Sequence, residues 1–253
     1  MINSFNFNGA DSRSFGVLVK SRNVYNQPER DVSYVSIPGR NGDLVFDNGR
    51  FKNINISYPC RLFAPDSPDS DDNISMAYTI RELKRALRAD GNYYILTDTF
   101  NPDYFRMATY TGGITFSDVS KKADVIDFNV NFYCKPQLYR WDGQSAQTFT
   151  NSGSGINASI YNPEDQPAKP IIRINGTHTG STNVIISSYS IVITDLSGYI
   201  DIDCETMNAY KGLANLNNSV SGGFPVLYPG TNQVVATTSS VTSIEITPRW
   251  WTV

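Results

Sequence analysis

Two long stretches of the chain alternate between apolar and polar side chains. In residues 54–62 the even-numbered positions are all apolar and the odd-numbered ones are mostly polar, and residues 126–134 repeat this pattern. Because successive side chains of a strand point to opposite faces, both stretches predict half-buried β-strands. Pro59 predicts a sheet edge or a bulge within the first of them. Their similar length and character lead us to expect that they share a sheet or face each other.

Two Asn-Gly pairs precede the first of these strands. Asn41-Gly42 closely follows Pro38-Gly39, and Asn48-Gly49 comes next in the chain. Asn-Gly suits the type I′ hairpin turn, because both central residues of that turn need a positive φ. The sequence therefore predicts two turns in quick succession, which carry Arg40 and Arg50.

One segment has the spacing of an amphipathic helix. Met76, Ile80, Leu83 and Leu87 recur every three or four residues and form one apolar stripe. A basic stripe on the other side can bind an acidic partner, but such a face is more commonly solvated. Its members are Arg81, Lys84, Arg85 and Arg88.

The loop before this helix is rich in proline and aspartate. Asp69, Asp71 and Asn73 alternate as calcium ligands do, but Ile74 and Ile80 occupy the positions where an EF-hand needs glycine and glutamate. We therefore expect a solvated loop rather than a metal site.

The composition narrows the class of protein. Charged residues make up 18% of the chain, the net charge is −3 and the pI is near 5.2, which argues against a nucleic-acid-binding module. No apolar run approaches the ~18 residues of a membrane span, and the first residues lack the apolar core of a signal peptide, so synthesis in a cytoplasm is expected. Cys60, Cys134 and Cys204 are widely spaced and are expected to be buried free thiols. The single histidine, His178, has no helical partner for a zinc site.

The composition changes in the middle of the chain and predicts two domains. A Gly/Ser-rich segment follows Trp141, and short strands separated by glycine turns continue to the C-terminus. We place the boundary near residues 136–145, which gives a first domain of residues 1–140 with the helix and a second of residues 141–245. The second is predicted to be an all-β sandwich. The tail, residues 246–253, must pack somewhere because it carries Trp250 and Trp251, and an alternative is that it joins the first domain.

At this point an ordered series of motifs resembles a known family. The series includes PGRNGDL, IRELKRAL, DFNVNFYCKPQLYR, KPIIRING and IDCETMNAYKG. Together they extend over more than two hundred residues and are similar to the distal tail (Dit) proteins of bacteriophages with long, flexible tails. No single motif is chemical, so the resemblance rests on their order.

The resemblance implies a mainly β fold and a structural function. It implies an N-terminal β-sandwich with one α-helix that forms a hexameric ring, alone or stacked in pairs, and a C-terminal galectin-like, jelly-roll type β-sandwich. Such a ring joins the tail tube protein to the tail-tip, baseplate or lysin-type hub protein and leaves a channel for DNA ejection. The protein would then be part of the virion, made in the host cytoplasm. No cofactor, metal, membrane or specific nucleic-acid contact is implied.

Given such a ring, the exposed turns become the candidate inter-subunit interface. Arginine is enriched at protein interfaces, and glycine turns can approach a neighbour closely. We expect Arg40 and Arg50 to meet carboxylates or backbone carbonyls of an adjacent copy. The candidate interface residues are Arg40, Asn41, Gly42 and Arg50.

Two alternatives from other functional classes remain. A galectin-like sandwich can bind sugars, and the candidate aromatic residues are Tyr161, Tyr189 and Tyr210, although a fold alone does not assign a ligand. A glycosidase needs two carboxylates that face one cleft. Its candidates are Asp201, Asp203 and Glu205, for which a solvated strand face is the simpler interpretation.

Overall fold

The two alternating stretches are antiparallel neighbours in one sheet. Strands β6 (Ile54–Phe63) and β9 (Val125–Arg140) pair continuously, from Ile54 opposite Cys134 to Phe63 opposite Val125. Buried and accessible side chains alternate along both strands. The expectation that they share a sheet is confirmed. Pro59 lies beside the end of β3 (Val17–Val19). The Pro59 carbonyl accepts a hydrogen bond from Lys20 N at 2.7 Å, so the N–H that proline lacks falls at the end of the β3–β6 ladder and not within it.

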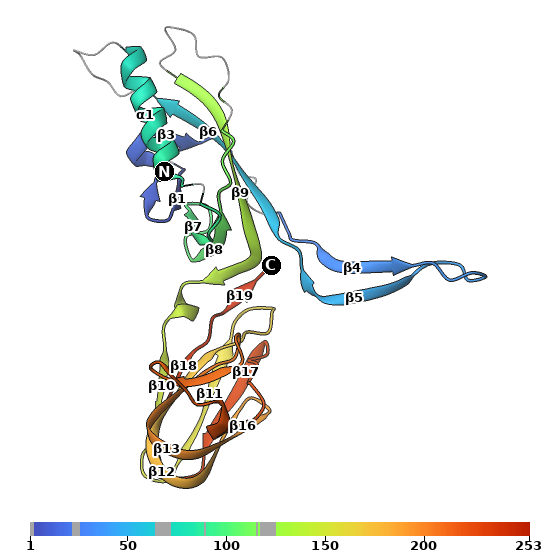
Figure 1. Ribbon diagram of the computed structural model, residues 1–253, viewed down its shortest axis with the longest axis vertical. Coiled ribbons are helices and arrows are strands. Elements are labelled where there is room, and N and C mark those ends of the chain that lie inside the picture. The colour runs from blue at the N-terminus through green and yellow to red at the C-terminus, as the bar shows by residue number, and fades with distance from the viewer. Residues whose placement is uncertain (1–2, 22–25, 64–71, 89, 115, 117–124) are drawn as a thin grey trace. The chain divides into compact units, whose positions relative to one another are not determined.

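The structure is a computed structural model that describes residues 3–21, 26–63, 72–88, 90–114, 116 and 125–253. The chain divides into two units, Met1–Leu138 with Val253, and Tyr139–Thr252. It is mainly β, with one α-helix among the described residues, as the sequence predicted (Figure 1). That helix is not long and apolar enough to cross a membrane.

The sheet of the first unit has the order β2-β1-β7-β8-β9-β6-β3. Its strands are connected by hairpins, by the helix α1 and by a 3₁₀ turn. Besides β6 and β9, this sheet and its connections contain β1 (Phe5–Phe7), β2 (Ala10–Asp11), η1 (Ser12–Phe15), β3 (Val17–Val19), α1 (Asp72–Ala86), β7 (Tyr94–Asp98) and β8 (Tyr104–Thr109).

An aromatic cluster fills the core of this unit. The Phe132 ring lies within 4.9–5.9 Å, between centroids, of the rings of Phe5, Phe7 and Tyr58. The apolar stripe of α1 belongs to the same core, and the predicted helix is thereby confirmed. Its buried members are Met76, Leu83 and Leu87.

The second unit is built on its own sheet around two long strands. The strand β12 pairs with β13 along almost its whole length, with β18 along its first half and with β17 near its end. At Gly176, a Cβ would lie 2.1 Å from the Ser240 carbonyl oxygen, so only glycine allows β18 to approach here. The elements are η2 (Asp142–Gln144), β10 (Gln147–Thr150), β11 (Ile156–Asn162), β12 (Ile171–Ile186), β13 (Tyr189–Asp203), β14 (Asn208–Lys211), β15 (Ala214–Asn215), η3 (Asn217–Ser219), β16 (Val220–Gly222), β17 (Gly230–Ala236), β18 (Val241–Thr247) and β19 (Trp251–Thr252).

The tail packs against the apolar cluster of the second unit, and its strand β19 pairs with β9. Trp250 is buried in that unit's own apolar cluster, and its carbonyl accepts a hydrogen bond from Arg140 N at 2.9 Å. The backbone N–H of Arg249 donates to the Gly143 carbonyl at 2.7 Å, which ties the chain end to the start of the unit.

All three cysteines are buried free thiols, as predicted from their spacing. Burial raises the pKa of Cys60, Cys134 and Cys204 to about 12 each, so the thiolate form is rare at neutral pH.

Replacing Phe132 tests the aromatic core. Because its ring is fully buried among aromatic neighbours, Phe132→Ala should lower the free energy of unfolding by about 3–5 kcal/mol. The matched control is the next residue, Tyr133, which is 44% exposed, and Tyr133→Ala should change stability by less than about 1 kcal/mol. Urea unfolding measures both, and equal effects would contradict the assignment of the core.

The division of the chain is tested by a fragment. Since residues 139–252 enclose an apolar cluster of their own, a fragment of residues 139–253 should fold alone. We expect dispersed amide resonances and one cooperative thermal transition. A disordered fragment would contradict two independently folding domains.

Candidate assembly interface

A hairpin arm in the first unit pairs with no other described strand. It consists of β4 (Arg30–Val35) and β5 (Leu44–Phe51), which form a two-stranded sheet of their own (Figure 1). A two-stranded hairpin is at best marginally stable in water, because it has no core. The outer edge of each strand also presents unpaired backbone groups. The arm therefore has an architecture that a partner would complete.

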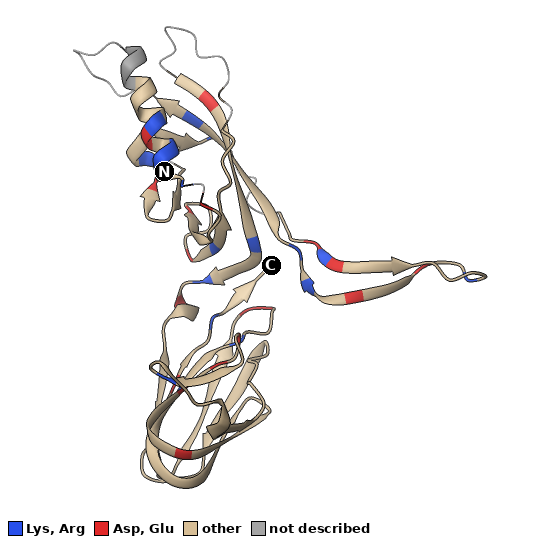
Figure 2. Cartoon of the chain, in the orientation of Figure 1, with Lys and Arg blue, Asp and Glu red and all other residues tan. Residues whose placement is uncertain are grey.

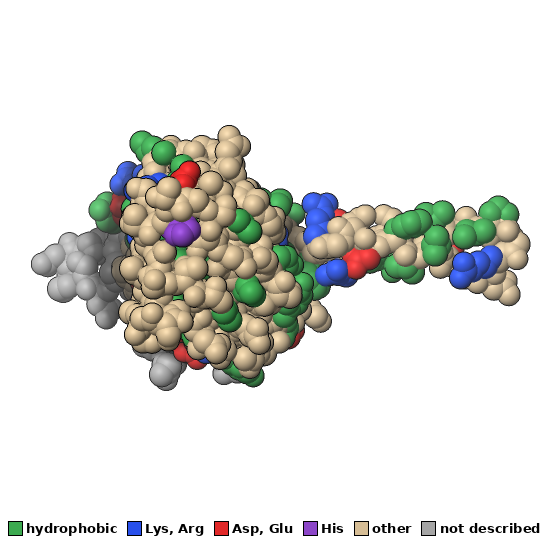
Figure 3. Space-filling model, turned by 90° about the horizontal axis from the view of Figure 1, so that it is seen from below, with side chains coloured by type: hydrophobic (Ala, Val, Ile, Leu, Met, Phe, Trp, Pro, Cys, Tyr) green, Lys and Arg blue, Asp and Glu red, His purple; other side chains and the backbone are tan. Residues whose placement is uncertain are grey.

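The middle of the arm carries exposed apolar side chains. Tyr34 is 67% exposed, and its cross-strand neighbour Val45 and the adjacent Phe46 are 54% and 52% exposed. Figure 3 shows apolar side chains along the arm, with basic side chains nearer its two ends. Scattered surface apolar residues need no explanation, but exposed apolar side chains on both faces of a two-stranded arm indicate a protein interaction site.

Cross-strand ion pairs occupy the base of the arm (Figure 2). Arg30 binds Asp47 through two parallel contacts of 3.0 and 2.8 Å, and Arg50 Nε lies 2.7 Å from Asp31. Hydrogen bonds from these arginines lower the pKa of Asp47 and of Asp31. Exposed pairs of this kind add little stability. Charges along the edge of a strand discourage other strands from pairing there. A partner is therefore expected to contact the apolar middle of the arm rather than its charged base.

The predicted interface residues fall at two places on the arm. Arg40, Asn41 and Gly42 lie in the exposed loop that connects β4 to β5, as the first predicted turn required. The second predicted turn, Asn48-Gly49, is wrong. Both residues lie inside β5.

Asn48-Gly49 forms a bulge. Between the pairs Arg30–Phe51 and Val32–Asp47, one residue of β4 faces three of β5. Gly49 has φ 73°, and its N–H donates to Asp47 Oδ1 at 2.8 Å. A positive φ at glycine serves a bulge as well as a turn, so the dipeptide alone did not distinguish them. Arg50 therefore lies on a strand, with its side chain 76% exposed and paired with Asp31.

Comparison with known proteins identifies the fold. No family model and no curated protein sequence matches the chain. Among solved structures, it is similar to the Dit protein of phage SPP1, described as a paradigm of the hub adsorption apparatus of phages that infect Gram-positive bacteria. The TM-score is 0.74, the identity 14%, and the match covers 97% of this chain and 98% of that one. The chain has the Dit fold.

Two further likenesses are weaker. Structures of the phage p2 baseplate in its activated conformation, with Sr and with Ca, each match at 9% identity over 97% of this chain, with TM-scores of 0.48 and 0.47. These values are too low to establish a shared fold, so the Dit fold rests on the SPP1 protein.

The carboxylates considered for catalysis are ion-paired in this Dit fold. Asp201 is bound by Arg173 through contacts of 2.7 and 2.9 Å, and Asp203 by Arg249 through contacts of 2.8 and 3.3 Å. The expectation of a solvated strand face is therefore wrong for these two, which are both buried. Only Glu205 is exposed, with Lys169 at 3.7 Å. The two arginines, Arg173 on β12 and Arg249 in the segment after β18, could not be assigned from the β13 sequence alone.

The other candidate ligand-binding residues do not form a shared site. Tyr161 is exposed on β11, whereas Tyr189 and Tyr210 are partly buried on β13 and β14. The Tyr189 hydroxyl already contacts the Tyr228 hydroxyl at 3.4 Å. Asp69 and Asp71 lie outside the described residues, and within those residues no three His, Cys, Asp or Glu side chains are grouped as metal ligands would be.

The basic face of α1 is exposed in the Dit fold. Two of its members have local partners, since Arg85 contacts Glu82 at 2.6 Å and Lys84 Nζ lies 5.5 Å from the centroid of the Phe116 ring. Arg81, Lys84 and Arg85 are exposed on α1, and Arg88 is exposed just after its end.

The Asp203–Arg249 pair predicts a pH-dependent contribution to stability. Burial raises the pKa of Asp203, but hydrogen bonds from Arg249 and the Glu205 N–H outweigh it and the net pKa is lowered. A lowered folded-state pKa contributes stability above the unfolded value of ~3.9, and this is lost as pH falls toward the folded value. At pH 7, Asp203→Asn should lower the free energy of unfolding by about 1–3 kcal/mol.

The measurement is urea unfolding of both proteins from pH 7 down to pH 3. The difference between wild type and Asp203→Asn should narrow below about pH 4, where the wild-type carboxylate becomes protonated in the unfolded chain. Glu205→Gln, at the exposed neighbour, is the control and should have little effect at either pH. A difference that is constant with pH would contradict this role of Asp203.

Proposed function

We propose that this chain is a structural hub at the distal end of a bacteriophage tail. Copies would form a hexameric ring that connects the tail tube to the tail-tip or baseplate apparatus. The observation that carries the proposal is the likeness to the SPP1 Dit protein over nearly the full length of both chains. The ordered motifs in the sequence support the same role independently of the coordinates. The role is structural rather than enzymatic.

The arm supplies the physical reason for assembly. In an isolated chain, Tyr34, Val45 and Phe46 would remain exposed to water. Burying an apolar side chain contributes roughly 1.5–3 kcal/mol, so a partner that covers these residues would be bound favourably. A neighbouring copy can bury them while presenting its own arm to the next copy. Such a head-to-tail contact closes into a ring when the rotation per copy is suitable. Arg40 and the Asn41-Gly42 loop would then reach the neighbour first, with the ion-paired base closer to its own sheet.

A ring of this kind would enclose a channel for DNA. Six copies with a net charge of −3 each give a formal charge of 6 × −3 = −18. Duplex DNA carries one negative charge per ~1.7 Å of its axis, so a wall that bound phosphates would retard it. We therefore place the exposed basic face of α1 away from the channel. The ring would meet the tail tube protein on one side and a tail-tip hub protein on the other.

Variants of the arm test the ring. The double variant Tyr34→Ser/Phe46→Ser removes exposed apolar area and should convert hexamers into smaller species without changing the fold. The variant Arg40→Glu/Arg50→Glu should weaken hexamers, because it reverses the charge of the loop that would reach the neighbour and breaks the Arg50–Asp31 pair at the base of the arm. Mass is measured by light scattering after size exclusion, and the fold by circular dichroism and thermal unfolding.

The control is Tyr161→Ser, which alters an equally exposed tyrosine of the second unit and should leave the mass unchanged. A wild-type chain that remains monomeric at high concentration would contradict the ring. A hexamer that survives in both double variants would remove the arm from the interface. Antibody labelling of virions should place the protein at the distal tail end, and labelling elsewhere would contradict the hub.

A further inference from the structure

The chain contains four Asn-Gly pairs, and one of them lies in the loop that connects β4 to β5. In such a pair, the backbone nitrogen of the glycine can attack the side-chain carbonyl carbon of the asparagine, because glycine has no side chain to obstruct the approach. A new N–C bond closes a five-membered succinimide ring, and the side-chain nitrogen leaves as ammonia. Water then opens the ring to aspartate or isoaspartate. The four pairs are Asn8-Gly9, Asn41-Gly42, Asn48-Gly49 and Asn175-Gly176.

In two of these pairs the attacking nitrogen is held by a hydrogen bond. The Gly9 N–H donates to Asn6 Oδ1 at 3.0 Å, and the Gly49 N–H donates to Asp47 Oδ1 at 2.8 Å. A nitrogen that donates to an acceptor retains its proton and points away from the neighbouring carboxamide. The attack at Asn8 and at Asn48 therefore requires that this hydrogen bond first be broken.

The pair in the second unit is held more firmly, because it belongs to the sheet. The Asn175 carboxamide donates to Ser243 Oγ at 3.0 Å and to Glu245 Oε1 at 2.8 Å. Gly176 is paired with β13 on one side of β12 and with β18 on the other. Ring closure at Asn175 thus requires the strand to open locally.

Asn41-Gly42 has none of these restraints. Both residues are exposed, and the last pair of the β4–β5 ladder is Val35 with Leu44, so both lie outside it. Within the described part of the chain, no hydrogen-bond acceptor is found for the Gly42 N–H. No atom beyond the adjoining residues lies within 4 Å of the position that a Gly42 Cβ would occupy, which leaves space for the ring.

We propose that Asn41 is a site of spontaneous deamidation in the folded protein. The only co-reactant is water, and the product has a carboxylate in place of a neutral amide. Residues 36–43 contain one arginine, Arg40, and one aspartate, Asp43, so the loop changes from formally neutral to singly negative. The isoaspartate product also lengthens the backbone by one carbon. This chemistry does not depend on the proposed tail function.

Peptide mapping by mass spectrometry tests the site. Native protein and protein unfolded in guanidinium are incubated in the same mildly alkaline buffer, and conversion is followed by the mass increase of the acid over the amide. Trypsin leaves Asn41 and Asn48 together in residues 41–50, so fragment ions of that one peptide compare the two directly. In guanidinium all four pairs should react at similar rates, since each asparagine precedes glycine.

In the native protein the four rates should separate. Asn41 should react about threefold or more faster than Asn48, where the Gly49 hydrogen bond must break, and about tenfold or more faster than Asn175, where the strand must open. A native rate at Asn41 as low as that at Asn175, or no higher than those at Asn8 and Asn48, would overturn the proposal.

A variant connects the modification with assembly. This step rests on the proposed function, in which Arg40 meets carboxylates or carbonyls of a neighbouring copy. The new negative charge beside Arg40 should then weaken the hexamer as Asn41 converts, whereas aged Asn41→Gln, which cannot close the five-membered ring, should keep its mass in light scattering. Hexamers that persist at full conversion of Asn41 would contradict the effect on assembly, and the peptide rates decide the chemistry separately.

Discussion

The continuous pairing of β6 with β9 is the constraint on which the first unit depends. Ten residues of β6 are matched in register by β9, and the side chains that point inward from both strands form the wall of the aromatic core. Because the side-chain period of a strand is two, a shift by one residue would turn Phe132 and Tyr58 to the other face. The helix α1 and the short strands β1 and β3 pack against the core face that this pairing forms.

The arm is stabilised by different interactions from those of the first unit's sheet. Immediately before β6, the strand β5 leaves the shared core, and β4 is the only described strand with which it pairs. There, backbone pairing and exposed ion pairs hold two strands whose apolar side chains remain exposed. The exposed apolar area of such a segment is available for contact with a partner. This is the physical basis of our proposal that copies contact one another through the arm rather than through the well-packed sheet.

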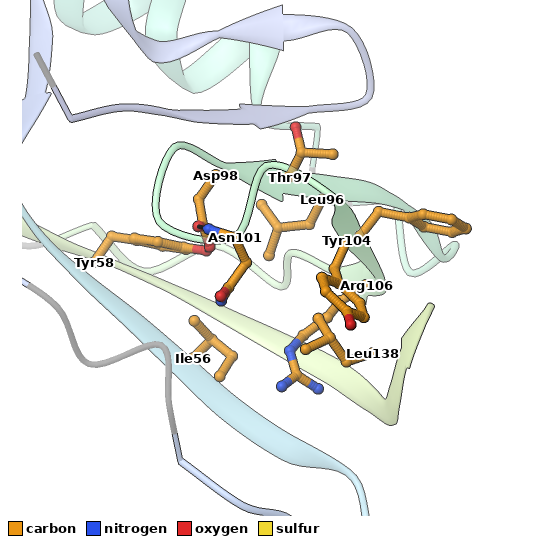
Figure 4. A pocket seen from close by; sticks show the side chains of 10 residues that line it. Ile56, Tyr58, Leu96, Thr97, Asp98, Asn101, Tyr104, Arg106 and Leu138 are labelled. Carbon is orange, nitrogen blue, oxygen red and sulfur yellow. Dashed lines mark hydrogen bonds between the residues drawn. The ribbon is translucent and has the colours of Figure 1, made fainter. Parts of the chain in front are cut away.

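Buried charge is treated differently in the two units. In the second, Asp201 and Asp203 are each matched by an arginine that is held on a neighbouring segment. In the first, the buried Arg106 on β8 donates to the Pro136 carbonyl at 3.1 Å and lies beside a small cavity (Figure 4).

Alternation and helical spacing in the sequence determined the two long strands, α1 and the buried side of each, since those periods follow directly from backbone geometry. The order of motifs also indicated the Dit fold. Local pattern could not separate a bulge from a turn at Asn48-Gly49, because glycine with positive φ satisfies both and only the register with β4 decides. Nor could it find the partners of Asp203 and Asp201. These partners come from segments that are distant in sequence. Arg249, for example, lies 46 residues from Asp203 and contacts it only in the folded unit.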